Sequence, residues 1–114
     1  MAMEIERTRR IVIGMLSAEG AVLFAALNMI GATLADNPEY AKGLTYCLHP
    51  LFFSIFTSIA SFIMVEIADH PNTPDEGHPH SKLNSYQTAN ALIVSSTMGF
   101  ALGGVIFYFK SLSV

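Results

Sequence analysis

Residues 11–35 read IVIGMLSAEGAVLFAALNMIGATLA, an almost wholly apolar stretch with one carboxylate, Glu19, inside it. A helix needs about 20 apolar residues to cross a hydrocarbon core about 30 Å thick, and this stretch is longer than that. An ionisable side chain is costly at such depth, so we expect Glu19 to face protein or water and not lipid. The stretch therefore predicts a membrane-spanning helix that shelters one acid.

Two further apolar runs follow, LHPLFFSIFTSIASFIMVEIA at residues 48–68 and ANALIVSSTMGFALGGVIFYF at residues 89–109. Pro38, within the polar segment at 36–39, is expected to end the first helix. Residues 69–88 are polar and predict a loop, with a helical start at Ser81. The pattern predicts an all-α integral membrane protein with three transmembrane helices in one domain over residues 1–114, assembled with other subunits.

Composition supports the membrane class and excludes others. The 114 residues are 52% hydrophobic and only 13% charged, whereas soluble domains carry about 25% charged residues. A net charge of −3 with six Lys and Arg argues against nucleic-acid binding, which needs a basic face. No nucleophile motif, phosphate-binding glycine loop or CxxC pair occurs, so we do not expect an enzyme, and lipid is the expected surrounding.

Small residues recur along one line of the first run and one line of the last. These positions are Gly14, Ala18, Ala21, Ala25, Asn28 and Ala32 in the first run, and Ala91, Ser95, Gly99 and Gly103 in the last. Small residues at this spacing let helix backbones approach closely in lipid. The contact could lie within one protomer or between subunits. Glu19 lies on a different face, so either the first helix is central or neighbouring subunits complete its surroundings.

The middle run has a hydroxyl side and an apolar side. Ser54, Thr57, Ser58 and Ser61 share one side, and Phe52, Phe56, Ile59 and Ile63 lie opposite. The hydroxyls could bond their own backbone carbonyls. Alternatively, they could line a path for water or an ion, or bind Glu19. The apolar side is expected to meet lipid.

Glu19 is the leading candidate for chemistry. One interpretation is a protonatable or cation-binding group on a translocation path. The residues of that ion pathway would be Glu19, Asn28, Ser54, Thr57, Ser58 and Ser61. A second interpretation is a protonated carboxyl that hydrogen-bonds across helices, and a third is a side chain in a wet vestibule.

Metal and haem are weaker candidates. Glu66, Asp69 and His70 have helical spacings of three and four, so they could converge on a metal, with His78 and His80 as added ligands. His49 could be one axial haem ligand, but the second would have to come from a partner chain.

Two functions follow from these features. The first is a homo-oligomer that translocates an ion or proton using Glu19. The alternative is a non-catalytic accessory subunit of a larger respiratory or photosynthetic membrane complex, and a cofactor-anchoring electron-transfer subunit is a third. Arg7, Arg9, Arg10 and Lys82 on one side, against Lys42 and Lys110 on the other, predict a cytoplasmic N-terminus.

Overall fold

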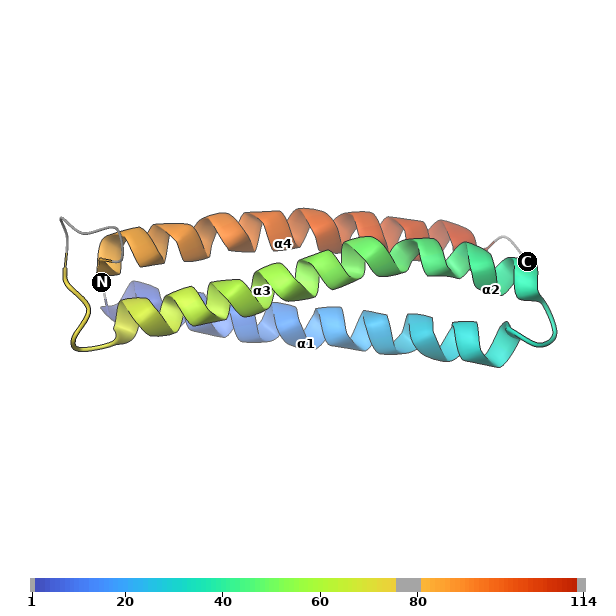
Figure 1. Cartoon of the computed structure of the whole chain (residues 1–114), viewed down its shortest axis with the longest axis horizontal. Helices are drawn as coiled ribbons and strands as arrows, with labels where there is room; N and C mark the ends of the chain where they lie inside the picture. The colour runs from blue at the N-terminus through green and yellow to red at the C-terminus, as the bar shows by residue number, and fades with distance from the viewer. Residues whose placement is uncertain (1, 76–80, 113–114) are drawn as a thin grey trace.

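The structure, a computed structural model, describes residues 2–75 and 81–112. In chain order the elements are α1 (Ala2–Thr33), α2 (Pro38–Leu44), the 3₁₀ helix η1 (Thr45–Cys47), α3 (Leu48–Asp69) and α4 (Lys82–Ser111). No β-strand occurs in the two described ranges. The long helices α1, α3 and α4 lie side by side in a bundle whose extents are 57 × 18 × 17 Å, and the two ends of the chain lie at opposite ends (Figure 1). The prediction of an all-α fold is confirmed.

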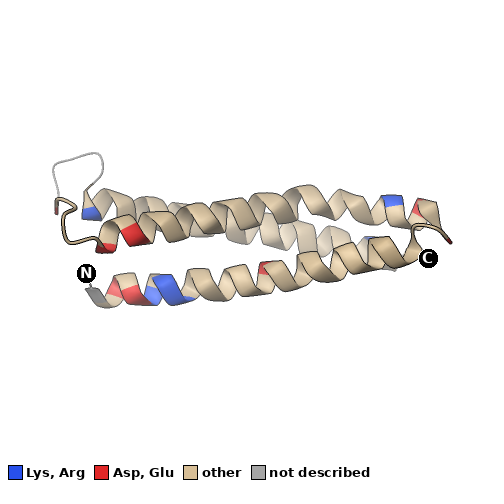
Figure 2. Cartoon of the chain, turned by 60° about the horizontal axis from the view of Figure 1, so that its bottom comes forward, with Lys and Arg blue, Asp and Glu red and all other residues tan. Residues whose placement is uncertain are grey.

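In the part of the chain that the structure describes, three helical stretches are long and apolar enough to cross a membrane: Met3–Thr33, Pro38–Asp69 and Lys82–Ser111. The first and third reach beyond the predicted bounds at their N-terminal ends. The second is longer than predicted because α2, η1 and α3 follow one another without a break. Figure 2 shows charged residues towards both ends of the bundle, and Glu19 is the only charged residue between Arg10 and Asp36.

Two helix starts have side-chain caps that explain where they begin. The Asn37 side chain accepts a hydrogen bond from the Tyr40 backbone N at 3.2 Å, and Pro38 occupies the first turn, where its missing N–H costs little. The Ser81 hydroxyl accepts from the Asn84 backbone N at 3.2 Å. The helical start predicted at Ser81 is therefore present, and α4 takes up the second part of the segment predicted as a loop.

The core repeats every seven residues on each long helix. The buried positions include Ile5, Val12, Glu19 and Ala26 on α1; Leu51, Ser58 and Val65, with Ser54, Ser61 and Ala68, on α3; and Ala89, Ser96 and Gly103 on α4. A seven-residue repeat keeps the same stripe of a helix towards its partners, as in coiled coils. Residues 19, 58 and 96 all belong to this repeat, which is why they can meet at one level.

Helices α3 and α4 approach closely through glycines. A Cβ added at Gly99 would lie 2.9 Å from Phe53 Cδ1, and one added at Gly103 would lie 2.8 Å from the Leu51 side chain. Gly99 and Gly103 thus pack within one chain, the first of the two readings for this run, whereas Ala91 is exposed and Ser95 is partly buried. On α3 the side with Phe52, Phe56, Ile59 and Ile63 is exposed, as expected for a surface that meets lipid.

Candidate functional site

Glu19, Ser58 and Ser96 form one polar level of the bundle, to which each long helix contributes one residue; we call it the Glu19 layer. The Glu19 side chain is 0% exposed. Ser58 Oγ donates to Glu19 Oε1 at 2.6 Å, and Ser96 Oγ lies 2.7 Å from Glu19 Oε2. The expectation that Glu19 faces protein and not lipid is confirmed, and the shelter comes from the same protomer.

The layer extends to one backbone carbonyl. Ser96 Oγ lies 2.8 Å from the Ser54 backbone O, and the Ser58 and Ser96 hydroxyls are also in hydrogen-bond contact. Among the described residues, no buried side-chain nitrogen or oxygen lacks a hydrogen-bond partner. Because unpaired polar groups are costly in an apolar interior, this closure makes a buried carboxyl tolerable.

The levels next to the layer are apolar or bonded to backbone. Val12 and Ala26, one repeat before and after Glu19, are fully buried. Ser54 donates to the Leu51 backbone O at 2.9 Å, and Ser61 donates to the Ala89 backbone O at 2.8 Å. Ser54 therefore bonds a carbonyl of its own helix, the simplest reading of this side of the middle helix, whereas Ser61 joins α3 to α4.

The predicted ion-pathway residues do not all come together. Ser58 binds Glu19, and Ser54 contributes its carbonyl through Ser96. Thr57 instead donates to carbonyls of its own helix, at 3.0 Å to both the Phe53 and the Ser54 O. Asn28 is exposed on a different face of α1 from Glu19, so the two side chains are not brought together within one chain.

Ser96 was missed by sequence reasoning. The sequence predicted a helix contact at its neighbour Ser95, on the small-residue line. Ser95 is only partly buried. The signal that could have found Ser96 is its spacing of seven from both Ala89 and Gly103, because all three lie on the buried line of α4.

The small-residue line of α1 lies on the outside of the bundle. Gly14, Ala18, Ala21, Ala25, Asn28 and Ala32 are all exposed, and we call these six residues the α1 outer face. A Cβ added at Gly14 would meet nothing within 4 Å. Helix α1 is therefore not central to the bundle: one face binds α3 and α4 through the Glu19 layer, and the α1 outer face is exposed.

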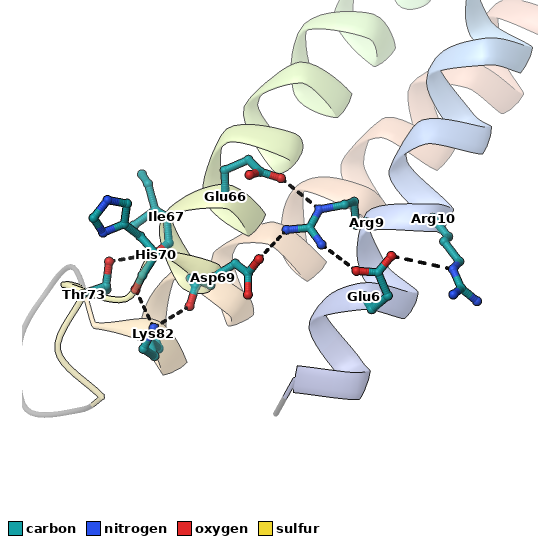
Figure 3. A network of polar contacts seen from close by, with 10 residues as sticks. Glu6, Arg9, Arg10, Glu66, Ile67, Asp69, His70, Thr73 and Lys82 are labelled. Atoms are coloured by element: carbon teal, nitrogen blue, oxygen red, sulfur yellow. Dashed lines mark hydrogen bonds and ion pairs between the residues drawn. The ribbon is translucent and has the colours of Figure 1, made fainter.

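At the end of the bundle that holds the N-terminus, Arg9 joins α1 to the end of α3 (Figure 3). Its Nε donates to Glu66 Oε1 at 2.9 Å and its Nη2 to Asp69 Oδ2 at 2.7 Å, while Nη1 donates to Glu6 Oε2 at 2.6 Å. The planar guanidinium suits several carboxylates at once. Lys82 Nζ also donates to the His70 backbone O at 2.6 Å and closes the end of α3.

The metal site predicted at Glu66, Asp69 and His70 is not formed. Both carboxylates bind Arg9, and His70 Nδ1 accepts from the Asn72 backbone N at 3.1 Å. Within residues 2–75 and 81–112, no three His, Cys, Asp or Glu side chains gather as metal ligands would. His78 and His80 lie outside the described residues.

His49 lies in an apolar groove between α3 and α4. The groove, of about 540 Å³, is lined by His49, Pro50, Phe53, Met98, Gly99 and Leu102. No other histidine lines it, and His70 lies at the other end of α3. A haem at His49 would still need its second ligand from another chain, so it stays a prediction.

Comparisons of this chain with models of protein families, with curated proteins and with solved structures give no match. Two features of the described residues bear on function: a carboxyl buried inside the bundle, and an exposed face of small residues on α1.

Proposed function

We propose that this chain is a small, non-catalytic subunit of a membrane assembly, which binds its neighbours through the α1 outer face. The observation that carries the proposal is the exposure of that face along the apolar part of α1. Residues 14–32 cover about 27 Å at 1.5 Å per residue, close to the thickness of a hydrocarbon core. A second helix could therefore pack along it through most of the membrane.

Packing physics favours a protein partner over lipid on this face. Helices associate in membranes largely through van der Waals contact between small residues, since lipid is as apolar as leucine. The comparable small residues of α4, Gly99 and Gly103, already contact α3 within the protomer. The α1 outer face also consists mainly of small residues, but these are exposed, so a neighbouring chain is the natural source of a contact.

Asn28 favours a second copy of this chain as the neighbour. Its side chain is exposed within the apolar part of α1 and has no hydrogen-bond partner among the described residues. A side-chain amide facing hydrocarbon is costly without such a bond. Because the amide is both donor and acceptor, Asn28 could pair with Asn28 of another copy. This supports the homo-oligomer predicted from the sequence.

The mass of the detergent-extracted particle tests this proposal. One chain has a mass of 12.4 kDa, so wild-type protein is expected at a multiple of this value. Ala25→Leu puts a bulky side chain on the α1 outer face and should shift the particle towards one chain. Ala101→Leu, at an exposed small residue of α4, is the matched control and should leave the mass unchanged. A monomeric wild type, or an equal mass for Ala25→Leu, would contradict the proposal.

Ion or proton translocation is a second candidate, supported by the contact of the Glu19 carboxyl with hydroxyls from two other helices. Such O–H groups can exchange protons, and Ser58 and Ser96 also contact each other. Its test is proton flux into vesicles that contain the purified protein. Glu19→Gln should abolish the flux and leave the particle mass unchanged. Equal flux in wild type and variant, or none in wild type, would remove this candidate.

The cationic residues support a cytoplasmic N-terminus within this proposal. Arg7, Arg9 and Arg10 are near the start of α1 and Lys82 is at the start of α4, at one end of the bundle, whereas Lys42 in α2 and Lys110 near the end of α4 are at the other end (Figure 1). Lysine and arginine are enriched in cytoplasmic flanks of membrane spans. Neighbouring copies would then have the same orientation in the membrane, so their α1 helices would pack in parallel through the α1 outer face.

A further inference from the structure

The line of the α1 outer face continues beyond the apolar run into the first turns of α1. At alternating steps of three and four, its positions are Glu4, Arg7, Ile11, Gly14, Ala18, Ala21, Ala25, Asn28 and Ala32. Such steps repeat every seven residues and keep one stripe of a helix towards a partner, as the buried stripe of α1 does inside the bundle. The stripe that carries the α1 outer face therefore begins with an acid and a base.

Glu4 and Arg7 are placed where a neighbouring chain could reach them. Arg7 is exposed and Glu4 is partly exposed. They precede Ile11, the first residue of the apolar run, by about 10 and 6 Å at 1.5 Å per residue. Both charges therefore lie outside the hydrocarbon core, where they avoid the cost of a charge in lipid.

The other charged side chains near the start of α1 have contacts within the same chain. Arg9 binds carboxylates of α1 and α3 at the distances given above, and Arg10 Nε lies 3.8 Å from Glu6 Oε1 (Figure 3). Neither arginine belongs to the outer stripe. The charges that a partner on this stripe would meet are those of Glu4 and Arg7.

Two parallel copies would bring these opposite charges together. In a parallel pair, each stripe residue packs against its own counterpart and against the adjacent stripe residue of the partner. Glu4 of one copy would then lie beside Arg7 of the other, and a two-fold axis repeats this contact. An antiparallel pair would instead place this end of α1 against its far end, where residues 29–33 carry no charge.

We propose that Glu4 and Arg7 select a second copy of this chain, parallel and in register, through two reciprocal ion pairs beside the membrane. The ion pairs depend on the proposed function, because they form only where two α1 outer faces meet. The small residues supply close contact, which many helices could share. The charges add specificity, because a helix without the complementary pair leaves them unmatched.

Cross-linking between two charge variants tests this selection. One chain carries Glu4→Arg and the other Arg7→Glu, and both carry Cys47→Ser and Ala25→Cys, so that a disulfide records each pair in the membrane. Position 25 lies about 27 Å from Arg7 along the helix, so the new thiol leaves the charges undisturbed. Tags of different mass distinguish mixed pairs from like pairs.

Mixed pairs should be favoured over like pairs. Two copies of one variant bring four charges of one sign together, whereas a mixed pair brings opposite charges together. Random pairing of equal amounts would give as many mixed pairs as like pairs. We expect an excess of mixed pairs of about threefold or more at low salt, which falls at high salt as the charges are screened.

Glu39 and Lys42 of α2 provide the matched control. They have the same spacing of three, and both are exposed at the other end of the bundle. Chains with Glu39→Arg and Lys42→Glu should give equal amounts of mixed and like pairs. A chain with both Glu4→Arg and Arg7→Glu restores opposite charges and should cross-link as well as the chain with native charges, which excludes misfolding as the cause.

Equal amounts of mixed and like pairs for the Glu4 and Arg7 variants would overturn the proposal, since these charges would then face water or lipid headgroups. The proposed function would survive that result if the chain with native charges still forms the disulfide at position 25. Absence of this disulfide in the chain with native charges would overturn both.

Discussion

At the scale of single residues, Gly103 shows how tightly the bundle is packed. A Cβ at this position would lie 2.8 Å from both Cγ and Cδ2 of Leu51, a fully buried side chain, and 3.3 Å from its backbone N. Gly103→Ala should therefore separate α4 from α3 and destabilise the protein by about 1–3 kcal/mol, the usual range for overpacking.

The neighbouring glycine is the control for this prediction. A Cβ at Gly104 would meet nothing within 4 Å, so Gly104→Ala should leave stability unchanged or raise it slightly, because alanine favours the helix. The measurement is the unfolding midpoint of each variant in detergent. Equal effects of the two substitutions would show that α3 and α4 do not meet at Gly103 as described.

Glu19 shows what sequence can and cannot predict about one residue. Its burial follows from an acid in an apolar span, since lipid exposure would be too costly. Its partners do not follow, because they depend on which residues of α3 and α4 share its level. Ser58 was predicted only as one of four hydroxyls on one side of the middle helix. Ser96 was not predicted, because a serine in an apolar run can equally bond a carbonyl of its own helix.

At the scale of elements, the long helices were predictable and their joins were not. Apolar runs of this length locate α1, α3 and α4, because a helix satisfies all backbone hydrogen bonds within its own segment in lipid. The first helix ends before Pro38, as predicted, but the short α2 that begins at Pro38 was not predicted, because it depends on a local cap at Asn37. The carboxylates at the end of α3 suggested a metal, but Arg9, from a helix distant in sequence, binds them.

The sequence predicts two different faces of α1, but only the structure shows which face lies inside the bundle and which lies outside. Periodicity places the small residues and Glu19 on different sides of the helix. It does not say which side the other two helices cover. The hydrogen bonds from Ser58 and Ser96 assign the Glu19 side to the inside of the protomer, which leaves the α1 outer face exposed.

At the scale of the whole molecule, the protomer is a closed three-helix bundle with one exposed surface suited to helix packing. The Glu19 layer satisfies its polar atoms internally, and the Arg9 contacts and the Lys82 cap close one end. The α1 outer face has no such partners within the described chain. Its exposed amide and row of small residues gain little stabilisation from contact with lipid. The account therefore depends most on what covers that face in the membrane.

Disulfide cross-linking in intact membranes tests this point most directly. Cys47 is the only cysteine, so Cys47→Ser provides a background without thiols, to which Ala25→Cys or, as a control, Ala101→Cys is added. A disulfide requires a Cα–Cα separation of roughly 4.4–6.8 Å. Close packing of two α1 helices would bring the two Ala25 positions within this range. The account predicts a cross-linked pair of chains for Ala25→Cys and none for Ala101→Cys. Equal cross-linking at both positions, or none at Ala25→Cys, would contradict it.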